Sequence, residues 1–261
     1  RHCIAVKSDK SLIEFGARRA QGCDGALMAS KYSYIGGFAG TSNVEAGMLF
    51  DIPVVGTHAH SYVMTFTKGW NELKNTKLVL NDVIISNDFK KDVLEAYELI
   101  RKMVYDFDTN ENELVAFTAY ALTFPTKFLA LIDTYDVINS GIPNFFAVAL
   151  ALASYGIPAI GVRLDSGDLA YQSVKVREFA HHISKTSNVP ALSNIKIVAS
   201  SDISESVLLS IQSQPNSITD FGVGTHLVTC KDQPALGGVY KLVKIDDVST
   251  MKLSETVSKT T

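Results

Sequence analysis

The feature that most constrains the fold is an alternation, between residues 127 and 225, of short apolar runs with longer helical patterns. The apolar runs predict buried strands, namely KFLALID (127–133), PAIGVRLD (158–165), NIKIVASSD (194–202) and DFGVGT (220–225). The stretches between them predict helices over 144–156, 168–185 and 204–214. Because strands joined by helices build a parallel sheet, the sequence predicts an α/β fold.

The first half of the chain continues this pattern less regularly. Capping residues and glycine stops predict helices over 8–22, 23–37 and 88–107, and the run PVVGT (53–57) predicts one more strand. No internal repeat or low-complexity linker interrupts the 261 residues, so we expect one catalytic domain over 1–261. Because the chain starts at Arg1 and ends in the polar SETVSKTT, we also expect a fragment of a longer protein.

Composition narrows the class of protein. Hydrophobic residues make up 46% of the chain and charged residues 20%, which supplies enough apolar material for a substantial core. The net charge of −3 argues against a protein that binds nucleic acid or a membrane surface through bulk charge. No apolar run approaches the ~20 residues of a membrane span. Three scattered cysteines fit a reducing compartment, so we expect a cytoplasmic protein.

Polar side chains gather at the carboxyl ends of the predicted strands. In parallel α/β folds this edge of the sheet carries the active site, so the pattern predicts an enzyme. The residues at these ends are Thr57, His58, His60, Asp133, Asp136, Arg163, Asp165, Asp168, Ser201, Asp202, Gly222, Gly224 and Thr225. Some have simpler interpretations: Asp168 and Asp202 could cap the helices that follow them, and Arg163 could pair with Asp165.

Two kinds of chemistry fit the two histidines of GTHAHS (56–61). A His-x-His pair at the end of a strand opens the metal site of metal-dependent amidohydrolases, because alternate residues share a face. That site needs further ligands, and only His226 and Asp202 are candidates, while Arg163 would repel a divalent cation. In the second interpretation one histidine is a nucleophile or acid–base group, oriented by Asp133 or Asp136, in a site for a phosphorylated substrate.

Five motifs spread over the chain carry a family resemblance. They are EFGARRAQGCDG (14–25), YSYIGGFAGTSNV (32–44), GTHAHS (56–61), GVRLDSGDL (161–169), and GVGT (222–225) followed by GGVYKLV (237–243). In this order they resemble the nicotinate phosphoribosyltransferase family in its animal-type form. The resemblance implies an irregular α/β barrel of the type II phosphoribosyltransferases and a homodimer. Compared with the family, we expect this chain to lack the N-terminal part and most of the C-terminal part.

The resemblance also implies a reaction. Enzymes of this family transfer the phosphoribosyl group of phosphoribosyl pyrophosphate to nicotinate, which gives nicotinate mononucleotide for NAD biosynthesis. ATP hydrolysis drives the transfer through a phosphohistidine, and Mg²⁺ accompanies ATP and phosphoribosyl pyrophosphate. The expected partners are these three substrates and a second copy of the chain, without nucleic acid, membrane or a tightly bound organic cofactor.

The motifs imply roles for individual residues. In GTHAHS the second histidine, His60, is the implied phosphate acceptor, whereas His58 occupies a variable position and is expected to have no role. The implied nicotinate-binding residues are Thr57, Arg163, Arg18 and Ser42. The implied phosphoribosyl-binding residues are Asp165, Ser201, Asp202, Gly222, Gly224 and Thr225. Asp133 or Asp136 would serve His60 or a Mg²⁺ ion, and the implied catalytic residues are His60, Asp133 and Asp165.

Overall fold

The computed structural model describes residues 5, 9–104, 107–229 and 240–250, and it divides into two compact units. Unit 1 comprises Arg1–Thr57, Leu164–Val174 and Lys196–Val239, and unit 2 comprises His58–Arg163, Lys175–Ile195 and Tyr240–Thr261. Each unit has parallel strands and buried apolar side chains of its own. The expected single domain over 1–261 stays a prediction.

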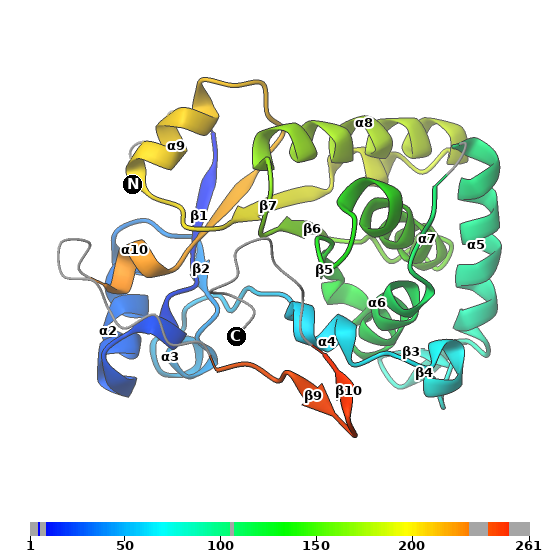
Figure 1. The fold of residues 1–261 in the computed structure, drawn as a ribbon, viewed down its shortest axis with the longest axis horizontal. Helices are drawn as coiled ribbons and strands as arrows, with labels where there is room; N and C mark the ends of the chain where they lie inside the picture. The colour runs from blue at the N-terminus through cyan, green and yellow to red at the C-terminus, as the bar shows by residue number, and fades with distance from the viewer. Residues whose placement is uncertain (1–4, 6–8, 105–106, 230–239, 251–261) are drawn as a thin grey trace. The chain divides into compact units, whose positions relative to one another are not determined.

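Unit 1 is built on a parallel sheet (Figure 1). Its strands are β1 (Ser11–Glu14), β2 (Gly40–Thr41), β7 (Lys196–Ser200) and β8 (Asp220–Val223), in the order β2-β1-β8-β7. In this register Glu14 of β1 is opposite Thr41 on one side and Val223 on the other. The strands therefore end at one edge, where the loops that follow them can form a site.

Helices follow the strands of unit 1, and two of them have side-chain caps. The helices are α2 (Gly22–Ile35), α3 (Val44–Phe50), α9 (Glu205–Gln212) and α10 (Thr225–Val228). Asn43 caps α3 by accepting a hydrogen bond from Ala46 N, and Ser204 caps α9 by accepting one from Val207 N. Ser204 therefore takes the capping role that the sequence also allowed for Asp202. Figure 1 shows α2 beside α3 and α10, against which it packs.

Unit 2 is largely helical (Figure 1). In it α5 (Phe89–Met103) and α6 (Glu111–Thr123) pack against α7 (Ile142–Ala153). The apolar sequence of α7 is buried around most of its circumference, as expected of a central helix. The parallel strands β5 (Leu129–Leu131) and β6 (Gly161–Leu164) complete this core. Phe128, just before β5, stacks on Phe145 of α7 with ring centroids 5.3 Å apart.

The other elements of unit 2 are short. They are α4 (His60–Met64), the π-helix η4 (Val137–Gly141), the 3-10 helices η2 (Gly69–Glu72), η3 (Pro125–Lys127) and η5 (Pro190–Asn194), and the hairpins β3 (Leu78–Leu80) with β4 (Val83–Ser86) and β9 (Lys244–Ile245) with β10 (Val248–Ser249). The long helix α8 (Leu169–Ser187) has residues in both units. At its start Asp168 accepts a hydrogen bond from Tyr171 N, so Asp168 is a helix cap.

Most predicted elements are confirmed. The strands predicted at 127–133, 158–165, 194–202 and 220–225 correspond to β5, β6, β7 and β8. The helices predicted at 23–37, 88–107, 144–156, 168–185 and 204–214 correspond to α2, α5, α7, α8 and α9. The helices α3, α4 and α6 and the hairpins have no counterpart among the predicted elements.

Two predictions are wrong. Where a helix was expected over 8–22, the described residues form β1 and then the 3-10 helix η1 (Ala17–Arg19). The segment pairs with β2 on one side and β8 on the other, and Leu12, Ile13 and Glu14 are buried, which favours an extended backbone. The strand expected at 53–57 is reduced to a single parallel bridge between Val54 and Thr41.

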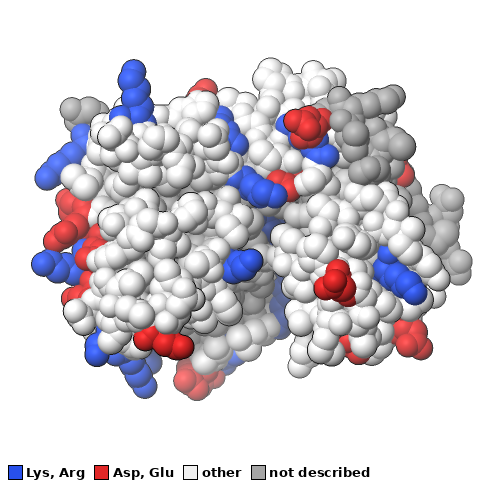
Figure 2. All heavy atoms as spheres, turned by 180° about the vertical axis from the view of Figure 1, so that it is seen from behind, with Lys and Arg blue, Asp and Glu red and all other residues white. Residues whose placement is uncertain are grey.

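Charged side chains are spread over the surface. On the face drawn in Figure 2, basic and acidic side chains of the described residues are interspersed, and wide areas carry neither. The described residues on this face form no continuous basic area. Within the described residues, no helix is both long enough and apolar enough to cross a membrane.

Candidate active site

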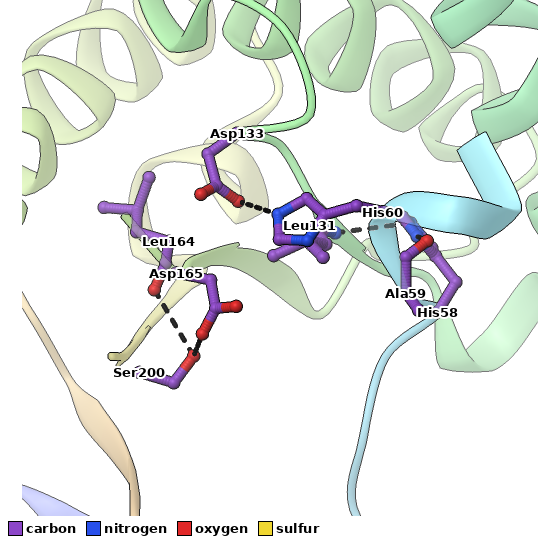
Figure 3. Close-up of polar contacts among 8 residues, drawn as sticks. All are labelled: His58, Ala59, His60, Leu131, Asp133, Leu164, Asp165 and Ser200. Carbon is purple, nitrogen blue, oxygen red and sulfur yellow. Dashed lines mark hydrogen bonds and ion pairs between the residues drawn. The ribbon is translucent and has the colours of Figure 1, made fainter. Parts of the chain in front are cut away.

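The centre of the candidate site in unit 2 is a contact between His60 and Asp133 (Figure 3). His60 begins α4, and Asp133 lies two residues beyond the end of β5. His60 Nε2 lies 3.0 Å from Asp133 Oδ1, and the two side chains are 13% and 1% exposed. A carboxylate that accepts a hydrogen bond from one ring N–H fixes the ring and leaves the lone pair of the other nitrogen for nucleophilic attack.

Asp136 was the alternative partner for His60, and the structure gives it another position. Its side chain accepts a hydrogen bond from Asn139 N over 2.6 Å and so caps the π-helix η4. The residue is exposed, whereas Asp133 is buried. Of the two candidate carboxylates, Asp133 is the one that contacts His60.

His58 has contacts that the sequence did not predict. Its Nε2 accepts a hydrogen bond from Leu131 N over 3.3 Å, and its ring lies among the rings of Tyr62, Phe117 and Tyr120. Burial lowers the pKa of His58 to about 3, and the nearby charges of Arg163 and His60 act in the same direction. The ring is therefore neutral at physiological pH.

Arg163 lies in the same unit, on β6. In the β5–β6 pairing it is opposite Leu131, two residues before Asp133. Its side chain is half-buried, and its positive charge reaches the ring of His58. Unit 2 thus brings together four of the residues at the predicted strand ends, His58, His60, Asp133 and Arg163.

The candidate residues of unit 1 include a second polar contact, between Asp165 and Ser200 (Figure 3). Ser200 ends β7, is buried, and donates its hydroxyl to Asp165 Oδ1 over 2.7 Å. The sequence predicted the neighbouring Ser201, which is exposed. In a strand successive side chains point to opposite faces, so only the register of β7 distinguishes the two serines. Sequence reasoning did not mark Ser200, which contacts the candidate residue Asp165.

Asp202 and His226 form a further pair in unit 1. His226 Nε2 lies 3.4 Å from Asp202 Oδ1, and the Asp202 side chain is 79% exposed. The backbone of Asp202 is in the left-handed region, with φ of 49°. An aspartate accepts that conformation more readily than most residues, which fits a tight turn after β7.

Close packing leaves no room for a side chain at either glycine of GVGT. A Cβ on Gly222 would collide with the ring of Phe15 and lie 3.2 Å from Ser200 Cβ. A Cβ on Gly224 would lie 3.0 Å from Phe15 O. Thr225 follows them as the first residue of α10 and is half-buried. The motif lies at the end of β8 as predicted, and its phosphate-binding role stays a prediction; residues 237–239 of GGVYKLV lie outside the described residues.

Unit 1 also has a buried carboxylate, that of Glu14, at the end of β1. Glu14 accepts hydrogen bonds from Ser30 Oγ over 2.8 Å, from Thr41 Oγ1 over 2.5 Å and from Gly16 N. These bonds join the turn after β1 to the turn after β2. Arg18 and Ser42 are exposed in these turns, Arg19 and Thr57 are half-buried, and Ser42 N donates to Glu14 O over 2.9 Å. Their contacts with nicotinate stay predictions.

Unit 2 contains one more buried acid that the sequence did not reveal. Glu113 of α6 accepts hydrogen bonds from Ser140 Oγ over 2.6 Å and from Asn144 Nδ2 over 3.1 Å. The pKa of Glu113 is raised to about 7, mainly by burial; the charges of Asp133 and Asp136 act in the same direction, and the two hydrogen bonds act against it. Glu113 follows a cap residue, Asn110, inside a helix that was not predicted, so no sequence pattern marked it.

The metal interpretation of His58 and His60 finds no support in the geometry. Both Nε2 atoms are engaged, one with Leu131 N and the other with Asp133 Oδ1. Across the part of the chain that the structure describes, no group of three or more His, Cys, Asp or Glu side chains is placed to hold a metal ion. A catalytic zinc site needs three such protein ligands.

Known proteins with related sequences point to one family. A model of the nicotinate phosphoribosyltransferase (NAPRTase) family matches residues 10–260. The chain is 47% identical to nicotinate phosphoribosyltransferase 2 of Arabidopsis thaliana, over 99% of this chain and 47% of that protein. It is 42% identical to nicotinate phosphoribosyltransferase of Homo sapiens, over 97% of this chain and 47% of that protein. The chain thus spans about half the length of the curated relatives it matches.

Solved structures agree with the sequence comparison. The crystal structure of human nicotinic acid phosphoribosyltransferase matches with a TM-score of 0.74 and 38% identity, over 95% of this chain and 50% of that chain. A nicotinate phosphoribosyltransferase from Vibrio cholerae, with 19% identity and a TM-score of 0.51, shares the fold. The predicted α/β barrel-type fold is confirmed by these matches. Motifs, fold and relatives together show that this chain belongs to the nicotinate phosphoribosyltransferase family.

Proposed function

We propose that the natural full-length protein transfers the phosphoribosyl group of phosphoribosyl pyrophosphate to nicotinate, coupled to ATP hydrolysis through a phosphate on His60. The observation that carries the proposal is the contact of His60 with the buried Asp133, in a chain of the nicotinate phosphoribosyltransferase family. A histidine held by a buried carboxylate is suited to act as a nucleophile at neutral pH.

The phosphohistidine step exchanges one bond for another. The lone pair of His60 attacks the γ-phosphorus of ATP, a nitrogen–phosphorus bond forms, and the bond to the bridging oxygen of ADP breaks. Asp133 holds the ring proton and balances the positive charge that develops on the imidazole. Hydrolysis of the phosphohistidine later releases phosphate and restores the free histidine.

The transfer step breaks the bond between the anomeric carbon and pyrophosphate while the ring nitrogen of nicotinate attacks that carbon. Positive charge builds on the ribose, and a carboxylate stabilises it. Asp165 is our candidate for this role and for the ribose hydroxyls, because Ser200 holds its carboxylate in place. Ser201, Asp202, Gly222, Gly224 and Thr225 are the candidate residues for the phosphoribosyl group.

Nicotinate carries a carboxylate, and a guanidinium matches its geometry. We assign this contact to Arg163, with Thr57, Arg18 and Ser42 as further candidates. Mg²⁺ is usually held by one or two carboxylates together with substrate phosphates. Asp133 fits such a shared role, with the ion entering together with ATP and phosphoribosyl pyrophosphate. The homodimer and the cytoplasmic location stay predictions.

The test is steady-state kinetics of the full-length protein with nicotinate, phosphoribosyl pyrophosphate, ATP and Mg²⁺, with nicotinate mononucleotide measured as the product. Arg163→Ala should weaken the binding of nicotinate roughly ten- to hundredfold, because a charge-assisted hydrogen bond is worth about 1.5–3 kcal/mol. The binding of nicotinamide, which carries no negative charge, should be affected far less. Arg163→Lys should restore part of the loss, since it keeps the charge without the planar fork.

Two results would contradict the proposal. Absence of nicotinate mononucleotide would remove the transferase assignment. One bound zinc per chain, together with hydrolytic activity that chelation abolishes and zinc restores, would favour a metal-dependent amidohydrolase. If Arg163→Ala weakens the binding of nicotinate and nicotinamide equally, the transferase assignment stands, but Arg18 becomes the candidate for the carboxylate contact.

A further inference from the structure

His58 and His60 contact the last residue of β5 and the loop just after it, at matching intervals. His58 bonds to Leu131 and His60 to Asp133, so the two histidines and their two partners are each separated by one residue (Figure 3). The short segment 58–60 therefore lies alongside residues 131–133, with one contact at each end.

The N–H group that donates to His58 is that of Leu131, on the free edge of β5. In a parallel strand, alternate N–H groups point to opposite sides. Ile132 N donates to Arg163 O on β6 over 3.1 Å, so Leu131 N faces away from β6. Backbone N–H groups inside a protein need an acceptor, and His58 Nε2 supplies it over 3.3 Å.

The state of the His58 ring suits this role. An acceptor at Nε2 requires the neutral ring with its proton on Nδ1, and Nδ1 lies 3.5 Å from Ala59 O. Burial among aromatic side chains lowers the pKa of His58 to about 3, so the ring keeps this form over the physiological range. The two nitrogens thus connect one ring to β5 and to the backbone just before His60.

The helix that carries His60 has no side-chain cap at its N-cap residue. Ala59 is the N-cap residue of α4, and it provides no side-chain hydrogen bond to the helix. The position of His60 then depends on the backbone of residues 58 and 59, which the His58 ring holds.

We propose that His58 is a positioning residue for His60: it fixes residues 58–60 on the edge of β5 so that His60 meets Asp133. The inference rests on the proposed phosphate-acceptor role of His60. It assigns a function to a histidine that the sequence pattern leaves without one, and it concerns geometry rather than contact with a substrate.

The test compares three variants of the full-length protein. His58→Leu keeps an apolar side chain of moderate size but removes the acceptor, whereas His58→Gln keeps an acceptor. Phe117→Leu is the packing control, because Phe117 touches the His58 ring and makes none of the hydrogen bonds of the segment. If His58→Leu fails to fold, His58→Asn replaces it, since its shorter side chain falls short of Leu131 N.

The first readout is the single-turnover rate of phosphate transfer from γ-labelled ATP to His60. We expect His58→Leu to slow this rate roughly tenfold to hundredfold, as misplacement of a reacting group by about 1 Å does. The concentration of ATP that gives half the maximal rate should change little. His58→Gln should regain most of the rate, and Phe117→Leu should keep it at temperatures where the variant is folded.

The second readout does not depend on activity. In the wild-type protein the ring proton of His60 shared with Asp133 should give a downfield proton resonance, and the Leu131 amide should exchange slowly with solvent. Both signals should be lost in His58→Leu and kept in His58→Gln. A rate for His58→Leu equal to that of the wild type, or a loss in Phe117→Leu as large as in His58→Leu, would overturn the inference. If wild-type protein shows both signals but takes up no labelled phosphate from ATP, the result would instead overturn the proposed function.

Discussion

The ionisation of Glu113 depends strongly on its surroundings. Its carboxyl group is fully buried, and within the described residues Oε1 has no hydrogen-bond partner, although Oε2 has two. An unpartnered oxygen in a buried carboxylate is costly, and a proton reduces this cost by removing the charge. Burial is the main cause of the raised pKa of about 7, and the charges of Asp133 and Asp136 act in the same direction.

The free energy of unfolding should therefore fall as the pH rises from about 4.5 to about 7. The folded protein holds the Glu113 proton up to about pH 7, whereas an unfolded chain releases it near the ordinary value of 4.5. The stabilisation is complete below the unfolded-state pKa of 4.5 and lost above the folded-state pKa of about 7. At about 1.4 kcal/mol per pH unit, the free energy of unfolding changes by roughly 3 kcal/mol over this range.

Urea unfolding of wild type and Glu113→Gln, measured from about pH 4.5 to about pH 8, checks this prediction. The glutamine keeps the shape of the side chain without the charge, so its stability should vary less over this range. If the wild type and the variant lose stability in parallel, another group is responsible.

Sequence reasoning reached some site residues and not others for a physical reason. His60, Asp133 and Asp165 follow predicted strands, and the end of a strand is visible in the sequence. The partner that each one contacts depends on register and on the edge of a strand. That is why the sequence left Asp133 and Asp136 as alternatives, did not mark Ser200, and assigned His58 no role.

At the scale of elements, the residues just after β1 pack so closely against β8 that Gly222 has no room for a side chain. The ring of Phe15, just after β1, occupies the space where a Cβ would project. Glu14, the last residue of β1, also joins the turns after β1 and β2 through its hydrogen bonds with Ser30 and Thr41. This edge of the sheet is therefore held by both close packing and a buried carboxylate.

Two glycine-to-alanine substitutions should consequently have opposite effects. Gly222→Ala should lower the free energy of unfolding by about 1–3 kcal/mol, because an overpacked core must shift Phe15 or the backbone. Gly25→Ala should raise it by about 0.5–1 kcal/mol, since Gly25 lies inside α2 and its Cβ would meet only Gln21 Cβ, at 3.7 Å. Chemical unfolding at one pH measures both, and a stabilising Gly222→Ala would contradict the packing described here.

The elements that were predicted correctly share a clear signal. The strands β5 to β8 are short apolar runs between helical stretches, and their environment in a parallel sheet agrees with that pattern. The segment SLIE of β1 is too short for its period to distinguish strand from helix, and only pairing with β2 and β8 decides it. The helix α6 is buried on several sides, so its sequence lacks the polar face that marks an amphipathic helix.

At the scale of the whole molecule, the candidate residues lie in two units that each contain parallel strands. Unit 2 holds His60, Asp133 and Arg163, and unit 1 holds Asp165 and the GVGT motif. Arg163 and Asp165 are separated in the sequence only by Leu164, with which β6 ends. The sequence predicted the α/β class from its alternation of strands and helices. It could not predict the two units, because they depend on which helices pack against which strands.

The most direct test of the account is the identity of the residue that ATP phosphorylates. The full-length protein is incubated with γ-labelled ATP and Mg²⁺, and the labelled residue is located by mass spectrometry under conditions that preserve phosphoramidates. We predict an acid-labile phosphate on His60 that is absent in His60→Ala, forms more slowly in Asp133→Asn, and is unchanged in the control His182→Ala, whose histidine lies on the exposed face of α8. Phosphate on His58, or on any residue of His60→Ala at the wild-type level, would contradict the assignment of His60 as the phosphate acceptor.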